Sequence, residues 1–179
     1  MLLMHWMASA VTYTWVGGLT TDWSLSTNWS PALSLGLLTS ADELVIPDAS
    51  TTLNDPTTST ASTITIGKLT IESNGVATLP SGLIINVTNS SGNLIDIATG
   101  AVFNNNSTIT LNGANVATGV FNNGSFYHTN GTLNINNTVT AIQNNNYFAN
   151  GGSSSININN SFTGINQSGS SFFVNYQIL

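Results

Sequence analysis

Residues able to carry out acid–base or metal chemistry are few in this chain of 179 residues. It has seven acidic residues, one lysine, no arginine, two histidines and no cysteine. General acid–base catalysis needs two titratable groups facing one cleft, and no acidic or basic residue other than His128 follows Asp96. His128 and His5 are distant in the sequence and have no cysteine beside them, so this pair is not expected to bind a metal. Serines are abundant, but no Gly-x-Ser-x-Gly motif marks a nucleophile. We expect no catalytic residue, no cofactor and no metal.

The acids at Asp42, Glu43 and Asp48 could supply oxygen ligands to calcium. Their spacing matches neither an EF-hand loop nor a glycine-rich calcium repeat, so we interpret them as solvated loop acids. A truncated polysaccharide lyase or hydrolase, which would work through clustered acids, is the third-ranked functional class. Thr-x-Thr pairs recur too irregularly to favour an ice-binding array.

Composition excludes further classes of partner. Hydrophobic residues make up 41 % of the chain and charged residues 4 %, and the net charge is −6. Without a basic patch, the chain has no electrostatic attraction for nucleic acid or an anionic membrane. No apolar stretch is long enough for a transmembrane helix, so membrane insertion is not expected.

Residues 101–179 are predicted to form a repeat. An apolar residue followed by two Asn or Gln residues recurs at spacings of 18, 21 and 23. Repeats of about 20 residues with short strands and polar turns are typical of solenoids. The four phrases begin at Phe103, Phe121, Ile142 and Ile165.

From Thr63 onward, apolar residues alternate with polar ones and glycines punctuate the runs. Alternation over three to six residues predicts short strands, about three in each coil of a parallel β-helix. Roughly seven or eight coils would make a rod about 35–40 Å long at the inter-strand spacing. Asparagines replace charges because stacked amides can hydrogen-bond from coil to coil, whereas stacked like charges repel. The ladder residues predicted are Asn105, Asn123, Asn144 and Asn166.

Residues 12–60 differ from the repeat because they hold most of the tryptophans and acids. The succession Trp15-x-Gly-Gly, Asp-Trp23, Asn28-Trp29-Ser-Pro and Ala-Asp42-Glu-Leu-Val-Ile-Pro47 resembles the opening module of right-handed β-helix proteins that bacteria secrete. Those proteins are autotransporter-like or adhesin-type surface chains. The resemblance implies an all-β, single-stranded right-handed parallel β-helix with a Trp-rich N-terminal cap. It assigns the capping role to Trp15, Trp23, Asn28, Trp29, Asp42 and Pro47.

Capping also follows from physical chemistry, because the first coil of a solenoid exposes apolar side chains and unpaired backbone groups. Large indole rings can cover the first and hydrogen-bond the second. The alternative is that the same residues contact glycans, with the tryptophan rings stacking on sugars.

The two ends of the chain are apolar. Residues 1–11 contain Ala8-Ser9-Ala10, which has the form of a signal-peptidase site, so the segment is either a signal remnant or mis-assigned start, or a first strand or cap. The C-terminal run is uncharged and strand-forming, which leaves an edge that could pair with another copy. The predicted assembly interface comprises Phe172, Phe173, Val174, Tyr176, Ile178 and Leu179 together with Leu2, Leu3 and Trp6.

We therefore expect three parts: an apolar segment 1–11, a cap with the first coils at 12–60, and solenoid repeats at 61–179. The favoured function is a non-enzymatic structural protein outside a bacterial cell, assembling end to end into a surface filament or matrix. The alternative is an adhesin stalk or carbohydrate-binding module of a secreted surface protein. Its partners would be copies of itself or host or matrix glycans.

Overall fold

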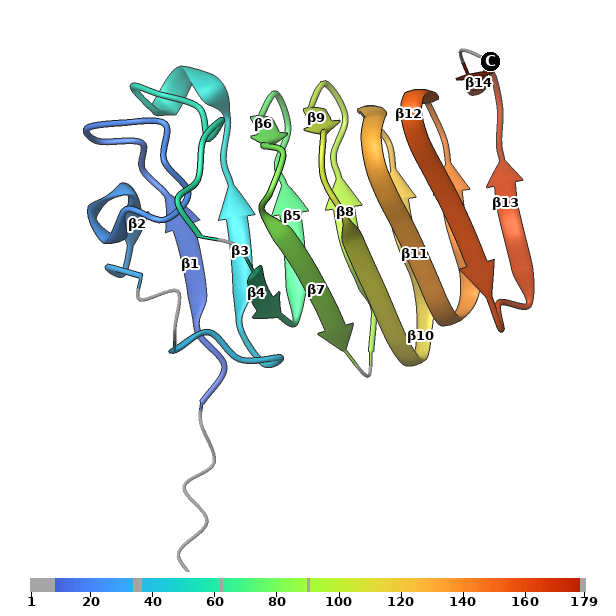
Figure 1. The fold of residues 1–179 in the computed structure, drawn as a ribbon, viewed down its shortest axis with the longest axis horizontal. Coiled ribbons are helices and arrows are strands. Elements are labelled where there is room, and N and C mark those ends of the chain that lie inside the picture. The colour runs from blue at the N-terminus through green and yellow to red at the C-terminus, as the bar shows by residue number, and fades with distance from the viewer. Residues whose placement is uncertain (1–8, 34–36, 62, 90, 178–179) are drawn as a thin grey trace, which may run out of the picture.

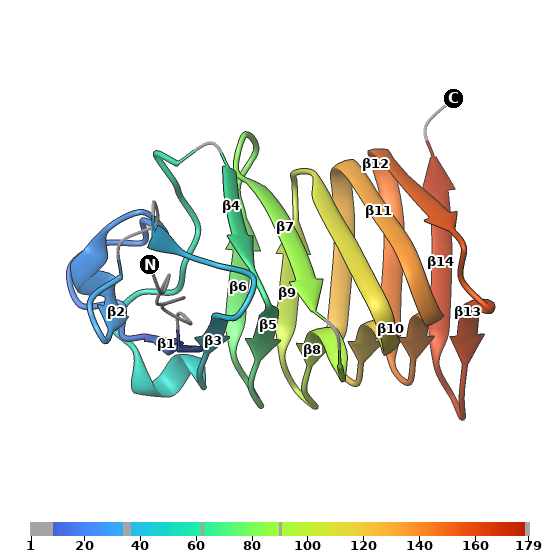
Figure 2. The ribbon, with the colours of Figure 1, turned by 90° about the horizontal axis from the view of Figure 1, so that it is seen from below.

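The computed structural model describes residues 9–33, 37–61, 63–89 and 91–177. It is a parallel β-solenoid of about five turns, with a cluster of tryptophans near the N-terminus. Figures 1 and 2 show the coils following one another along a single axis. The predicted all-β parallel solenoid with an N-terminal Trp-rich cap is thus confirmed.

Most of the described chain is strand. The elements are β1 (Thr12–Trp15), the 3-10 helix η1 (Ser26–Asn28), β2 (Trp29–Ser30), β3 (Glu43–Ile46), the 3-10 helix η3 (Ala49–Thr51), β4 (Thr63–Ile66), β5 (Lys68–Ile71), β6 (Val76–Leu79), β7 (Ile84–Asn89), β8 (Asn93–Ile97), β9 (Val102–Asn105), β10 (Ile109–Asn122), β11 (Ser125–Asn144), β12 (Tyr147–Asn159), β13 (Thr163–Gln167) and β14 (Phe172–Gln177).

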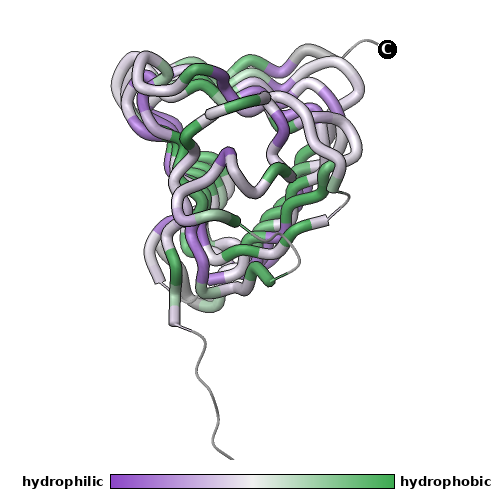
Figure 3. Tube along the Cα trace, turned by 90° about the vertical axis from the view of Figure 1, so that its left-hand side faces the viewer, coloured by the Kyte–Doolittle hydropathy of each residue, from purple (hydrophilic) through white to green (hydrophobic). Residues whose placement is uncertain are grey.

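Each coil has three sides, which Figure 3 shows in a view along the solenoid. Face A consists of β4, β7, the first part of β10, the middle of β11 and the end of β12. Face B consists of β1, β3, β5, β8, the second part of β10, the end of β11 and β13. Face C consists of β6, β9, the starts of β11 and β12, and β14. Neighbouring coils pair in parallel on all three faces, while β2 pairs antiparallel with β1.

The coils are longer and fewer than predicted. On face A the paired positions Ile64, Ile85, Ile109, Leu133 and Ile156 give coil lengths of 21, 24, 24 and 23 residues. The prediction of seven or eight coils was wrong, because a coil of this length and the cap leave room for about five. The predicted strand length was also too short: β10, β11 and β12 have 14, 20 and 13 residues and bend around the corners.

The four repeated phrases do not occupy equivalent positions. Phe103 lies on face C, where it pairs with Phe126, whereas Phe121 lies on face B, where it pairs with Gln143. Ile142 and Ile165 are true neighbours on face B. The spacing of 18 therefore separates two faces of adjoining coils and is not a coil length.

Inward-facing side chains stack in columns along the core. On face C, consecutive ring centroids lie 5.1, 4.7 and 5.1 Å apart in the series Phe103, Phe126, Phe148 and Phe173. The first three rings are fully buried, and Phe173 packs against the core from the last coil. This column ties three successive turns to the C-terminal strand through apolar burial and ring contact.

Candidate functional site

Three tryptophan rings close the N-terminal end of the core. Trp15, Trp23 and Trp29 are at most 2 % exposed, and their ring centroids lie 5.1–6.3 Å apart. Trp15 Nε1 donates to the carbonyl of Asn54 at 2.6 Å, and Trp23 Nε1 to that of Thr78 at 2.9 Å. Trp29 Nε1 donates to the Trp23 carbonyl at 2.9 Å. Since Thr78 belongs to the first strand of face C, the cap satisfies a backbone group that has no earlier rung to pair with.

The other residues assigned to the cap hold its loops. Asn28 is fully buried; its amide nitrogen donates to the carbonyls of Thr20 and Asp22 at 3.1 and 3.0 Å, and its oxygen accepts from Leu19 N at 3.3 Å. Pro47 is half-buried directly after β3.

Asp42 uses both carboxylate oxygens inside the cap. Oδ1 accepts from Val11 N at 2.9 Å, and Oδ2 accepts from the Thr39 backbone N–H at 2.8 Å and the Thr39 hydroxyl at 3.0 Å. The side chain is 4 % exposed, which differs from the solvated loop acid that the sequence suggested.

Sugar stacking requires an exposed ring face, and the three cap tryptophans present none. Their burial and their bonds to backbone carbonyls are what a closing role requires. The glycan alternative consequently has to rest on other residues.

The three acids weighed for calcium do not converge. Glu43 Oε1 accepts from the Thr70 hydroxyl at 2.6 Å, whereas Asp48 accepts from Ser50 N at 2.8 Å and from the Asn74 amide at 3.1 Å. The Ser50 N–H, helped by Asn74, lowers the pKa of the Asp48 carboxyl below its ordinary value. Within the described ranges, no group of three or more His, Cys, Asp or Glu side chains is arranged to hold a metal ion. No helix in the part of the chain that the structure describes is long and apolar enough to cross a membrane.

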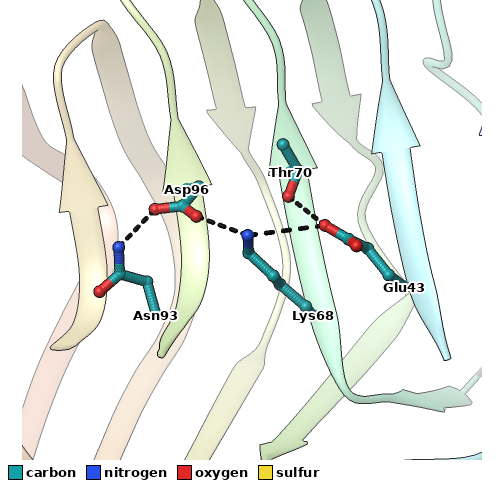
Figure 4. Close-up of polar contacts among 5 residues, drawn as sticks. All are labelled: Glu43, Lys68, Thr70, Asn93 and Asp96. Atoms are coloured by element: carbon teal, nitrogen blue, oxygen red, sulfur yellow. Dashed lines mark hydrogen bonds and ion pairs between the residues drawn. The ribbon is translucent and has the colours of Figure 1, made fainter. Parts of the chain in front are cut away.

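The single lysine joins two acids across neighbouring coils on face B (Figure 4). Lys68 Nζ lies 2.7 Å from Asp96 Oδ2 and 3.6 Å from Glu43 Oε1. Burial pulls the pKa of Lys68 down, but the hydrogen bond and charge of Asp96, with Glu43, outweigh it and raise that pKa above its ordinary value. The sequence had left the acids of the cap without a basic neighbour; this was wrong for Glu43, whose parallel register partner is Lys68.

A groove of about 760 Å³ lies beside this charged row, where β5, β8 and β10 end. Phe121 contributes a half-buried ring that points outward, because its neighbours Val120 and Asn122 are buried in the core. The other groove residues on which the argument below depends are Asp48, Glu72, Ser73, Asp96 and Asn123.

Asparagine side chains do bridge successive coils, in several separate columns. The column of Asn112, Asn136 and Asn159 spans three coils with amide bonds of 3.0 Å each. Each predicted ladder residue bonds a residue one coil away, and none bonds another member of the predicted set. The pairs are Asn105 with His128, Asn123 with Asn145, Asn144 with Asn122, and Asn166 with Gln143.

His128 occupies one rung of a buried polar column on face C. Its Nε2 lies 3.0 Å from the carbonyl of Ser155, and its Nδ1 lies 2.9 Å from the amide nitrogen of Asn105. A carbonyl only accepts, so Nε2 carries the proton and Nδ1 accepts from Asn105. Burial lowers the pKa of His128 below its ordinary value, so the neutral ring belongs to the fold. His5 lies outside the described residues.

The last coil has strand neighbours on one side only. In the described structure, β13 pairs with β11 alone, β14 with β12 alone, and the end of β12 with β11 alone. Inward side chains of this coil are partly uncovered: Ile165 is 40 % exposed, while Ile142 one coil earlier is fully buried.

Among the residues predicted for assembly, Phe172 is exposed and Phe173 and Val174 are half-buried on β14. The backbone of Tyr176 pairs with Gly151. The remaining predicted residues, Leu2, Leu3, Trp6, Ile178 and Leu179, lie outside the described part of the chain.

No family model, curated protein or solved structure matches the chain. The resemblance of the Trp-rich segment to autotransporter-like and adhesin-type proteins therefore stays a prediction. What the structure supports is the solenoid and its buried tryptophan cluster.

The groove was missed in the sequence, although a signal for it exists. Asp48, Glu72, Asp96 and Phe121 are spaced 24, 24 and 25 residues apart, which is one coil each. The spacings of 18 to 23 between phrases concealed this period. A search at the offset of 25 between Glu43 and Lys68 would have aligned the charged row.

Proposed function

We propose that this protein is a non-enzymatic structural β-solenoid that assembles end to end through its C-terminal coil. The observation that carries the proposal is the last coil itself, in which three strands have an unpaired side and the inward side chains are incompletely covered. Unpaired strand edges are templates for pairing with another chain, and exposed apolar area adds a favourable burial term.

Charge supports the same surface. The last charged residue is Asp96, so two copies meeting at this coil bring no like charges together. An edge strand is normally protected by lysine, proline or a bulge, and β13 and β14 contain no lysine or proline.

The two ends differ. At the N-terminal end, the backbone N–H of Thr78 donates to Pro56 O at 2.8 Å, and β1 is paired by β2. Assembly through the C-terminal coil alone would stop at pairs of rods. Fibres would need a second joining surface, and residues 1–10 are the predicted source of it. The extracellular bacterial surface as its location belongs to the same proposal and is tested by protease accessibility on intact cells.

The test is Ile165→Lys, which places a charge on the last strand of face B. We expect the purified wild-type chain to sediment as an assembly and the variant to sediment as a monomer with an unchanged circular dichroism spectrum. Val139→Lys is the matched control, because Val139 is 50 % exposed but lies between coils that are already paired. A wild-type chain that stays monomeric at all concentrations would contradict the proposal.

Negative-stain electron microscopy separates the two forms of assembly. Fibres that shorten to paired rods when residues 1–10 are deleted would assign that segment to the second joining surface. Paired rods already present in the full chain would limit assembly to the C-terminal coil.

A further inference from the structure

The groove at the ends of β5, β8 and β10 has the size of a ligand site. Its volume of about 760 Å³ falls within the range common for small-molecule sites, about 300–1,000 Å³. It is formed by coils in the middle of the solenoid, so its shape is independent of how the ends of the rod assemble. Its lining combines one aromatic ring with polar groups from four successive turns.

Some of these polar groups are already used and others are free. Asp48 accepts from Ser50 and Asn74, and both oxygens of Asp96 are bonded, to Asn93 at 2.7 Å and to Lys68 at 2.7 Å. Within the described residues, three groove-lining groups have no hydrogen-bond partner from the protein. They are the carboxylate of Glu72, the hydroxyl of Ser73 and the amide nitrogen of Asn123.

This inventory excludes two ligand classes by number and sign of charge. A hard cation such as calcium takes about six to eight oxygen ligands, and Glu72 is the one lining carboxylate left unbonded. An anionic ligand would meet three carboxylates and no lining cation, because Lys68 stands outside the groove and is held by Asp96.

A wholly apolar ligand is disfavoured for a different reason. It would cover the Phe121 ring but strip water from Glu72 and Asn123 without replacing their hydrogen bonds. The ligand that satisfies all of these groups has an apolar C–H face and several hydroxyls, and it carries no charge.

We infer that this groove binds a neutral oligosaccharide. The Phe121 ring stacks on the C–H face of one sugar unit, the Glu72 carboxylate accepts from neighbouring hydroxyls, and the Asn123 amide donates to a hydroxyl or ring oxygen. Carbohydrate binding thereby moves from the buried tryptophans to the outer surface of face B.

The experiment is a titration of the full chain with a panel of neutral hexasaccharides of glucose, mannose, galactose, xylose and N-acetylglucosamine. Binding is read by saturation-transfer NMR and calorimetry. We expect at least one member to bind, and Phe121→Ala and Glu72→Gln each to weaken it about tenfold. Phe162→Ala is the matched control, since Phe162 is 93 % exposed, lies outside the groove and should leave the affinity unchanged.

Three results would overturn the inference. One is the absence of binding by every panel member up to about 10 mM. Another is binding that both groove variants leave intact. The third is calorimetric binding of calcium alone that Glu72→Gln abolishes. Glu72 is exposed, so its variant should fold even if truncation of Phe121 disturbs the sheet.

Discussion

The imidazole Nδ1 of His128 accepts a hydrogen bond from the side-chain amide of Asn105, one coil earlier, at 2.9 Å. Both side chains are fully buried, and the opposite ring nitrogen donates to the carbonyl of Ser155 at 3.0 Å. Protonating the ring would place two donors face to face at Nδ1. The fold therefore selects the neutral ring, and burial lowers the pKa of His128.

Stability should consequently fall in mild acid. The unfolded chain takes up a proton at the ordinary histidine pKa of 6.5, and the folded chain does so at a lower pH. The contribution is fully present above pH 6.5 and is lost below it, at about 1.4 kcal/mol per pH unit while the folded ring stays neutral. Urea unfolding between about pH 7.5 and 5.5 measures this slope, since ordinary carboxyl groups remain ionised there.

His128→Asn provides the matched variant, because its register partners Asn105 and Asn150 are already amides. We expect it to abolish the slope below pH 6.5. His128→Leu should also abolish the slope and in addition lower the free energy of unfolding at pH 7.5 by about 2–5 kcal/mol, since it leaves Asn105 and Ser155 O unpaired. His5→Asn should change neither property; a slope that disappears in this control instead would refute the assignment to His128.

Trp23→Phe tests the closing role of the tryptophan cluster. The change removes the N–H that donates to Thr78 O at 2.9 Å and leaves a space between two rings 5.8 and 6.3 Å away. We expect the free energy of unfolding to fall by about 2–3 kcal/mol, from the unsatisfied carbonyl and the cavity together. Urea denaturation followed by near-ultraviolet circular dichroism reports it. A loss no larger than that of exposed Phe162→Ala would mean that the ring is not needed to close the core.

Lys68→Met tests the charged row on face B. The lysine is about one-third exposed and holds Asp96 at 2.7 Å, so solvent screens much of the attraction. A double-mutant cycle with Asp96→Asn should give a coupling of about 0.5–1 kcal/mol that shrinks in 1 M salt. Coupling that persists unchanged in high salt would identify packing of the lysine stem, rather than charge, as the source.

Strand positions could be predicted from the sequence because each inward side chain must be apolar and each outward one need not be. Ile64 and Ile66 are buried while Thr63 and Thr65 are exposed, as period two requires. The tryptophan cap was predictable for a similar reason, since the first coil needs large side chains that also donate hydrogen bonds.

Coil length was not predictable from the repeated phrases, because different corners use the same local chemistry. The side chain of Asn105 accepts from Ser107 N at 3.0 Å, and that of Asn122 accepts from Gly124 N at 3.2 Å. These are equivalent turns at two different corners of the triangle. Similarity between corners was taken for similarity between coils, so register partners such as Glu43 and Lys68 were not aligned and the groove stayed hidden.

Glycine at corners provides a last test, through two positions with nearly the same backbone. Gly131 has φ +78° and Gly92 has φ +72°, so alanine meets the same left-handed penalty of about 1–2 kcal/mol at both. Their surroundings differ: a Cβ at position 131 would lie 2.5 Å from the backbone carbonyl of Ser107, whereas one at position 92 would meet nothing within 4 Å.

We therefore expect Gly92→Ala to lower the free energy of unfolding by about 1 kcal/mol and Gly131→Ala by about 3 kcal/mol or more, as measured in urea. The excess reports how tightly one coil is stacked on the next, since the Ser107 backbone belongs to the preceding corner and cannot rotate away. Equal losses for the two variants would mean that the coils can separate locally at this corner at little cost.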